Sequence, residues 1–449
     1  MILLLGIAVV PLLVLYIFAL SRSVLLGWIS LLAVMLYDYT FGANVYGGVG
    51  INITLVDIVE ICLLVAGGIR TIPRLRERYE GRTNTLAYLA VFAFSMVRGI
   101  AAHGFAHAAA GARLFVGFLI AVTYFLTAPV DPQSVRKYVN AYLCYGLALT
   151  IVACLAFSGL HVGAIAWAHN DPEIESMIDG RVLPSSCALA LAFCFFLSLA
   201  ISRYRSSGIY LKWLSALFLG LAVALRARSV WVVLAAGIAS LLFLDRKLIR
   251  RLIPMAALIM FFIAGYALLS GSAARSVEDQ LSKSATDDNT WLFRVAMWQS
   301  LLQKSQTPTG VLFGQDLGGG YEVFDLMAGR YVDIPPHNEY IAQYLSEGLA
   351  GVALLLWFII RPLRSFWRLS STDMMAVEPS SSAWVAVIVG IILYSIPYEP
   401  MADNYALLAI ANAMIFRTNQ DVEIGEQKDL KALPILPIPV SPDIPEEVP

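Results

Sequence analysis

The chain has 449 residues, of which 59% are hydrophobic and 14% are charged. Soluble domains carry about a quarter charged residues, so this composition excludes an ordinary soluble protein and favours a polytopic membrane protein. The net charge of −1 gives no basic surface of the kind that binds nucleic acid, and we expect no nucleic-acid partner.

Apolar runs that approach the roughly 20 residues needed to cross a bilayer recur along the chain. The first run lacks a basic segment and a clear cleavage site, so we interpret it as a retained helix rather than a signal peptide. We expect an all-α integral membrane fold with about 12 or 13 transmembrane helices. Their expected positions are 2–20, 24–41, 51–69, 84–102, 109–129, 138–159, 182–201, 210–225, 230–244, 252–270, 340–360, 382–398 and 403–416.

Basic loops alternate with loops that are nearly free of lysine and arginine. Because the cytoplasmic loops of membrane proteins carry an excess of lysine and arginine, the basic loops are expected inside and the long loop 271–336 outside. We therefore divide the chain into an N-terminal transmembrane bundle, an outer loop that ends in a candidate catalytic motif, and C-terminal transmembrane helices. A proline-rich tail follows, which is expected to be a disordered cytoplasmic extension. The four regions are 1–270, 271–339, 340–418 and 419–449.

The outer loop contains a predicted amphipathic helix, because Trp291, Val295, Trp298 and Leu302 recur at helical spacing. Such a helix is expected to lie on the membrane surface. A glycine-rich turn follows at 310–320, where backbone can approach a ligand closely.

The tetrad Pro336-His337-Asn338-Glu339 joins this loop to a membrane helix. A histidine at such a boundary can carry out proton chemistry at the membrane face. The alternative is an ordinary interfacial residue at a helix start. Small residues near Glu347, in the run Glu347-Gly348-Leu349-Ala350-Gly351, permit close helix packing that would hold His337 rigidly.

Three arginines are expected on the outer face, against the usual charge bias of membrane proteins: Arg226, Arg228 and Arg294. Arginine binds phosphate through a planar fork and stays charged, which indicates anion capture. The alternatives are side chains that extend to the interface, or a lipid-headgroup contact. Arg98 and Arg113 lie near the outer ends of the fourth and fifth spans, and an extension of the basic lining by them is the less favoured interpretation.

No metal site or cofactor motif is evident. His103 and His107 stand four residues apart but have no third ligand nearby. The five cysteines all lie in predicted spans and are interpreted as buried apolar residues. We therefore expect neither a metal nor a cofactor.

Four pieces in order resemble the O-antigen ligase/O-antigen polymerase superfamily of bacterial membrane glycosyltransferases. The resemblance covers roughly 210–365. Its pieces are Arg228-Ser229-Val230-Trp231, the Arg294-x-x-x-Trp298 helix, the turn Gly310–Gly320, and His337-Asn338-Glu339-Tyr340 with Glu347-Gly348 and Gly351. The N-terminal half matches only as generic hydrophobic spans. Ala227 departs from the small polar residue that members often have there, and a thirteenth span would depart from the usual twelve.

The resemblance implies a GT-C-like fold with one large periplasmic loop, in the bacterial inner membrane. It implies metal-independent, inverting transfer of an undecaprenyl-diphosphate-linked glycan at the periplasmic face, for O-antigen or exopolysaccharide synthesis. The acceptor would be another glycan or the lipid A-core, and polymerase is slightly favoured over ligase. By position, Arg228 and Arg294, with Arg226 beside them, would hold the diphosphate, and His337 would be the catalytic base. Supporting roles fall to Asn338, Glu347 and Trp298.

Two alternatives stay open: a multi-span transporter or flippase of a lipid-linked substrate, and a non-catalytic scaffold. A transporter is expected to have polar residues near the bilayer midplane, and broken helices or repeat symmetry. The polar candidates in this chain gather instead at one face.

Overall fold

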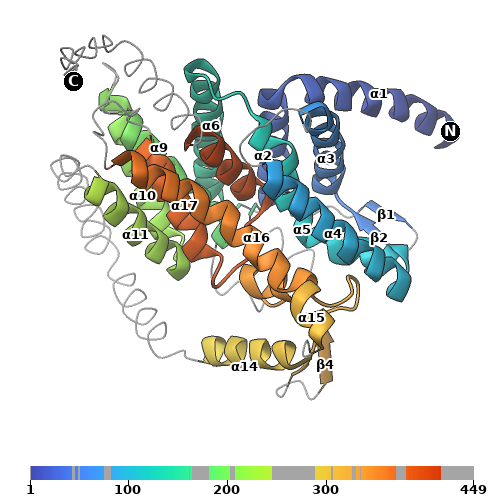
Figure 1. Ribbon diagram of the computed structural model, residues 1–449. Helices are drawn as coiled ribbons and strands as arrows, with labels where there is room; N and C mark the ends of the chain where they lie inside the picture. The colour runs from blue at the N-terminus through green and yellow to red at the C-terminus, as the bar shows by residue number, and fades with distance from the viewer. Residues whose placement is uncertain are drawn as a thin grey trace, which may run out of the picture.

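The computed structural model describes residues 2–42, 46–48, 51–74, 82–160, 162–163, 182–202, 208–244, 289–304, 307–325, 330–333, 335–370 and 381–415. Helices dominate these ranges (Figure 1). The first group is α1 (Ile2–Arg22), α2 (Val24–Phe41), α3 (Leu55–Arg74), α4 (Arg82–His103), α5 (Phe105–Thr123), the 3₁₀ turn η1 (Phe125–Thr127) and α6 (Pro132–Phe157). The second group is α9 (Ser185–Ile201), α10 (Gly208–Ala224), α11 (Arg228–Leu244), α14 (Asn289–Lys304), α15 (Pro308–Phe313), α16 (Glu339–Ser370), α17 (Ser381–Tyr394) and a last helix at 402–415.

Two short antiparallel hairpins interrupt the helices of the described chain. Strand β1 (Tyr46–Gly48) pairs with β2 (Ile51–Ile53), and β3 (Glu322–Asp325) pairs with β4 (Arg330–Asp333). The β3–β4 hairpin lies in the loop expected outside the membrane, whereas β2 occupies the first three residues of the span expected at 51–69, so the helix there begins only at Leu55. The helical class expected from the sequence therefore holds at the level of the bundle, with these two additions.

Five described helices are long and apolar enough to cross a membrane: Val24–Phe41, Arg82–His103, Phe105–Thr127, Pro132–Phe157 and Glu339–Phe366. Five shorter apolar helices accompany them: Val10–Arg22, Ser185–Ile201, Ile209–Ala224, Arg228–Leu244 and Ser382–Tyr394. These helices are consistent with a multi-pass membrane protein. The larger span count stays a prediction, and the expected span at 252–270 and the tail from 419 lie outside the described residues.

The centre of the bundle is formed by α9 and the helix 402–415. Every residue from Ser186 to Ala200 is buried, and so is every residue of 402–415. Helix α9 packs against α6, α10, α11 and α17. A helix that is apolar on all sides is surrounded by other helices rather than facing water. Its neighbours therefore carry the outer surface of the bundle.

Several segments that are distant in sequence meet at one end of this bundle. Helices α14 and α15 and the β3–β4 hairpin lie there, beside the start of α16 (Figure 1). The amide of Glu339, which begins α16, donates to the carbonyl oxygen of Ser395, just after α17, at 3.0 Å. Helix α11 packs along α17, with Val233 against Gly390. Because the two helices run in opposite directions, the start of α11 lies at the same end of the bundle as the segment that follows α17 (Figure 1).

The glycine-rich turn at 314–320 is held by Arg98 of α4. The Arg98 guanidinium donates to the carbonyl oxygens of Phe313 and Gly314, at 3.2 and 3.0 Å. It also forms an ion pair with Asp316 at 2.7 Å. Arg98 is therefore engaged within the protein, which argues against a role for it in a basic lining.

Helix α16 bends at Gly348, where the backbone is non-helical with φ of 66°. A side-chain carbon at Gly348 would overlap the backbone of Leu312 and Phe313 in α15. The close packing predicted from the small residues is confirmed at this position. Gly351 differs, because its neighbours are side chains of its own helix, Glu347 and Gln343.

Substitution Gly348→Ala should destabilise the protein by about 1–3 kcal/mol, because alanine brings both a left-handed backbone penalty and a clash with α15. Thermal unfolding of the purified protein in detergent measures the change. Gly68→Ala is the matched control, since Gly68 has open space around it. Equal melting temperatures for the two variants would contradict the packing described for the bend.

Candidate functional site

His337 adopts a left-handed backbone conformation, with φ of 48°. Histidine is one of the few non-glycine residue types enriched in this region, although the conformation still carries strain. The next residue, Asn338, is the N-cap of α16, because its side-chain oxygen accepts from the Ile341 amide at 3.0 Å. The membrane helix therefore begins one residue earlier than predicted, and His337 occupies the turn that leads into it.

The turn around His337 is fixed by Trp298 of α14. The Trp298 indole N–H donates to the Pro336 carbonyl oxygen at 2.6 Å. Trp298 packs against a small cluster that includes Met297, Leu301 and Leu345. The predicted supporting role of Trp298 thus has a concrete geometry: it ties the outer-loop helix to the residue before His337.

Arg294 lies one turn before Trp298 and faces the segment after α17. Its guanidinium donates to the Pro397 carbonyl oxygen at 3.1 Å. It also lies over the Tyr398 ring, with Cζ 5.0 Å from the ring centroid, which is a cation–π contact. These contacts fix the arginine beside the His337 turn.

Two groups at this site have displaced pKa values. Burial lowers the pKa of the His337 imidazole below its usual range, and the positive charge of Arg294 lowers it further. Burial raises the pKa of the Glu399 carboxyl to about 7, while the His337 backbone amide acts in the opposite direction. At neutral pH the imidazole is therefore uncharged, and the carboxyl is close to its midpoint.

The three arginines expected to act together are only partly assembled. Arg294 is beside His337, whereas Arg226 and Arg228 are exposed residues at the turn between α10 and α11. Arg226 has a left-handed backbone, with φ of 58°. No hydrogen bond or ion pair joins Arg228 to another described residue. Arg228 shares the end of the bundle with the 395–400 segment, but the described contacts do not join it to His337.

Glu347 lies fully buried, two turns into α16. Its Oε2 accepts from the Gln343 amide at 2.6 Å, and the same amide group contacts the Tyr88 hydroxyl of α4 at 3.2 Å. The second carboxyl oxygen, Oε1, has no partner among the described residues. Glu347 therefore belongs to a polar contact between α4 and α16 rather than to the His337 turn.

Sequence reasoning missed the segment Pro397-Tyr398-Glu399, which forms one wall of the site. Glu399 is half-buried, and its covered Oε1 atom lacks a hydrogen-bond partner among the described residues. In the sequence, Pro397 and Tyr398 end the span expected at 382–398, and Glu399 follows in the short connection to the next span, so the local pattern does not link them to the site. Pairing this segment with His337 required the fold, because more than fifty residues separate them.

Within the described residues, no group of three or more His, Cys, Asp or Glu side chains is arranged to hold a metal ion. A scan against models of known protein families finds no match, and a search of curated proteins finds no significant relative. A function for this chain is therefore argued from its own residues and from the motif resemblance.

Glu399→Gln should raise the melting temperature at pH 8 and leave it near the wild-type value at pH 5. The pKa of Glu399 is higher in the folded protein than the ordinary value of 4.5, so stability is lost as the pH rises through about 7. Glutamine mimics the protonated carboxyl and removes that loss. Thermal unfolding at the two pH values provides the measurement, and an equal effect at both would rule out the burial described for this carboxyl.

Proposed function

We propose that this protein is a membrane glycosyltransferase of the O-antigen ligase/polymerase type, which transfers an undecaprenyl-diphosphate-linked glycan during synthesis of a surface polysaccharide. The observation that carries the proposal is Arg294 beside the half-buried, uncharged imidazole of His337, at the start of a membrane helix. A fixed cation and a neutral base are the two groups that such a transfer requires.

The transfer forms one bond and breaks one. The acceptor hydroxyl oxygen attacks the anomeric carbon of the donor sugar, and the bond from that carbon to the diphosphate oxygen breaks. Attack from the face opposite the diphosphate inverts the anomeric configuration. The hydroxyl proton moves to His337, a contribution of about 10²–10⁴-fold to the rate for a well-placed base. The lowered pKa of His337 supports this role, because the imidazole is ready to accept a proton near pH 7.

The arginines stabilise the departing diphosphate, whose negative charge grows as the bond breaks. Arginine has five N–H donors, and the one hydrogen bond of Arg294 to Pro397 leaves others for phosphate oxygens. Arg228, with Arg226 beside it, approaches from the neighbouring turn. Fixed donors of this kind lower a barrier by several kcal/mol without a metal ion.

The reaction is assigned to the periplasmic face of the bacterial inner membrane. The lipid tail of the donor lies among the helices, and its glycan extends outward toward His337. The acceptor is another lipid-linked glycan for a polymerase, or a lipid A-core sugar for a ligase. We favour the polymerase slightly, because no sequence feature points specifically to the lipopolysaccharide core.

Transport of a lipid-linked substrate is the second candidate, and one observation favours it. Helices α2, α3 and α5 bring together Asp38, Glu60 and an ion pair of Asp57 with Arg113 at 2.6 Å. Asp38 and Glu60 are buried. Buried acidic groups inside a membrane bundle are common in ion-coupled transporters. The pairing also shows that Arg113 does not extend a free basic surface.

Substitution His337→Ala should reduce glycan transfer by about 10²-fold or more, because it removes the side chain proposed as the base. Arg294→Lys should also reduce transfer, since lysine keeps the charge but loses the planar fork. The readout is the surface-polysaccharide ladder of the host strain with each variant as its sole copy.

His103→Ala is the matched histidine control, because His103 is exposed at the end of α4 and is not one of the residues proposed to act in the transfer. Membrane levels of each variant are compared by immunoblot. A normal ladder from His337→Ala would exclude the catalytic assignment. If the His337→Ala variant gives no ladder and its protein is absent from the membrane, His337→Gln is tested in its place, because glutamine preserves the approximate shape of the histidine side chain.

The glycan profile of a deletion strain separates the two forms of the reaction. Single repeat units still attached to their acceptor, without longer chains, indicate a polymerase. Accumulated lipid-linked polymer, with none on lipid A, indicates a ligase. Substrate retained on the cytoplasmic side of the membrane would instead favour the transport function.

A further inference from the structure

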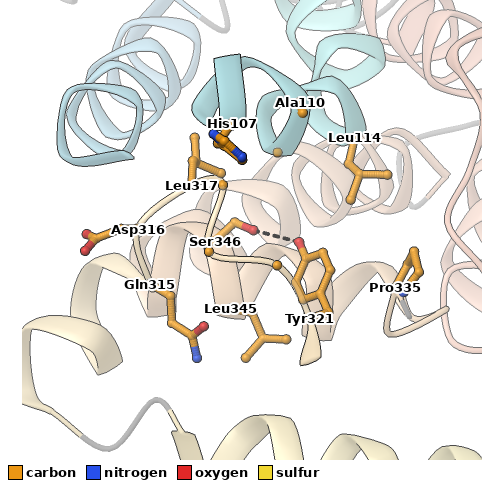
Figure 2. Close-up of a pocket in the computed structure, with 14 residues that line it drawn as sticks. His107, Ala110, Leu114, Gln315, Asp316, Leu317, Tyr321, Pro335, Leu345 and Ser346 are labelled. Carbon is orange, nitrogen blue, oxygen red and sulfur yellow. Dashed lines mark hydrogen bonds between the residues drawn. The ribbon is translucent and has the colours of Figure 1, made fainter. Parts of the chain in front are cut away.

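A cavity of about 400 Å³ opens beside the His337 turn and is separate from the arginines. Helix α5 forms one side, the glycine-rich segment 315–321 forms another, and α16 contributes Leu345 and Ser346. Figure 2 shows the Tyr321 ring between Ser346 and Pro335, below the residues of α5. The volume falls in the range of small-molecule sites, roughly 300–1,000 Å³.

The cavity combines one aromatic ring with several uncharged polar groups. The Tyr321 hydroxyl lies 3.1 Å from the Ser346 hydroxyl (Figure 2). Gln315 and His107 add an amide and an imidazole to the lining. Hydroxyls, amides and imidazoles both donate and accept hydrogen bonds, which matches a ligand that carries several hydroxyl groups. An aromatic face beside them offers a flat apolar surface to the C–H side of a sugar ring.

The charge of the cavity argues against a diphosphate as its ligand. Its described lining contains neither lysine nor arginine, the residues that bind phosphate. The one carboxylate, Asp316, is paired with Arg98 at 2.7 Å. The polar lining is equally unsuited to a lipid tail, because buried polar groups without partners are costly. A neutral, hydroxyl-rich ligand fits both constraints.

The wall of the cavity is fixed before any ligand arrives. Gly318 lies so close to the His107 backbone that a side-chain carbon there would clash. Leu317 is buried beside it, against Ala112 and Phe115 of α5. A preformed wall reduces the entropy lost on binding.

The cavity is within reach of the candidate base. Pro335 lines it and precedes His337 by two residues, so their Cα atoms are at most roughly 7 Å apart. Tyr321 and Trp298 also pack on the same cluster around Leu345. A ligand in the cavity therefore lies next to the turn that holds the base.

We propose that this cavity is a subsite for one uncharged sugar residue of the glycan, held by Tyr321, Ser346, Gln315 and the glycine-rich wall. The identity of the ligand as part of a glycan rests on the proposed function. The subsite positions the sugar so that the glycan chain passes the His337 turn.

The test fills the cavity and measures sugar binding directly. Ala110 is an exposed residue of α5 that lines the cavity, so Ala110→Trp places an indole in it. Ala106→Trp is the matched control, one turn earlier on α5, exposed and outside the lining. The probes are the methyl glycosides of glucose, galactose, N-acetylglucosamine and rhamnose. Binding to the full-length protein in lipid nanodiscs is measured by saturation-transfer NMR.

We expect the wild type and Ala106→Trp to bind at least one glycoside, and Ala110→Trp to lose about tenfold or more of that binding, because a filled pocket excludes its ligand. Equal melting temperatures show that the two tryptophan variants are folded. Binding of no glycoside by the wild type, or equal binding by Ala110→Trp, would overturn the subsite.

The readout requires no turnover, so the subsite and the reaction are tested separately. If the His337→Ala variant still binds sugar and still transfers glycan normally, the subsite is supported and the assignment of His337 as the base is rejected. If His337→Ala loses glycan transfer while Ala110→Trp binds sugar as well as the wild type, the assignment of His337 as the base is supported and the subsite is rejected.

Discussion

The hydrogen bond from the Trp298 indole to the Pro336 carbonyl joins the outer-loop helix α14 to the start of membrane helix α16. The geometry of the site depends on this link. It fixes the residue that precedes the left-handed turn of His337, and it brings Arg294, one helical turn away, beside that turn. A water-exposed loop thereby becomes part of the wall of a membrane bundle.

The same end of the bundle concentrates polar groups that would be costly elsewhere. Glu399 is half-buried and carries a raised pKa, while His337 is half-buried and carries a lowered one. Both shifts act toward the neutral form, so the imidazole is uncharged at pH 7 and the carboxyl is only partly ionised. The fixed positive charge of Arg294 is therefore the main attraction that an anionic ligand meets at this turn.

Much of this arrangement could be predicted from the sequence. The helical bundle, the helix that carries Arg294 and Trp298, and the helix start at His337 all follow from local patterns of apolar spacing and capping. At Gly348 the sequence predicts close packing but not the bend, because a glycine in a helical sequence does not indicate which neighbouring element it contacts. The partners of Arg98 and Arg113 could not be predicted, because an arginine paired with Asp316 or Asp57 looks the same in sequence as one that faces a ligand.

The parts that could not be predicted are contacts between distant segments. Glu399 reaches the His337 turn only because α17 returns to the end of the bundle where α16 begins. The 400 Å³ cavity is walled by the glycine-rich segment, where Gly318 lies against the α5 backbone, and residue spacing along the chain does not predict that contact.

Reconstitution tests the central claim most directly. The purified protein is placed in liposomes with the host's undecaprenyl-diphosphate-linked repeat unit as the only glycan, in the presence of EDTA, and glycan products are separated by mass. The account predicts longer lipid-linked chains, with release of undecaprenyl diphosphate, from a polymerase; for a ligase, adding lipid A-core should yield glycan joined to it. No product with either acceptor, from folded wild-type protein, would contradict the account.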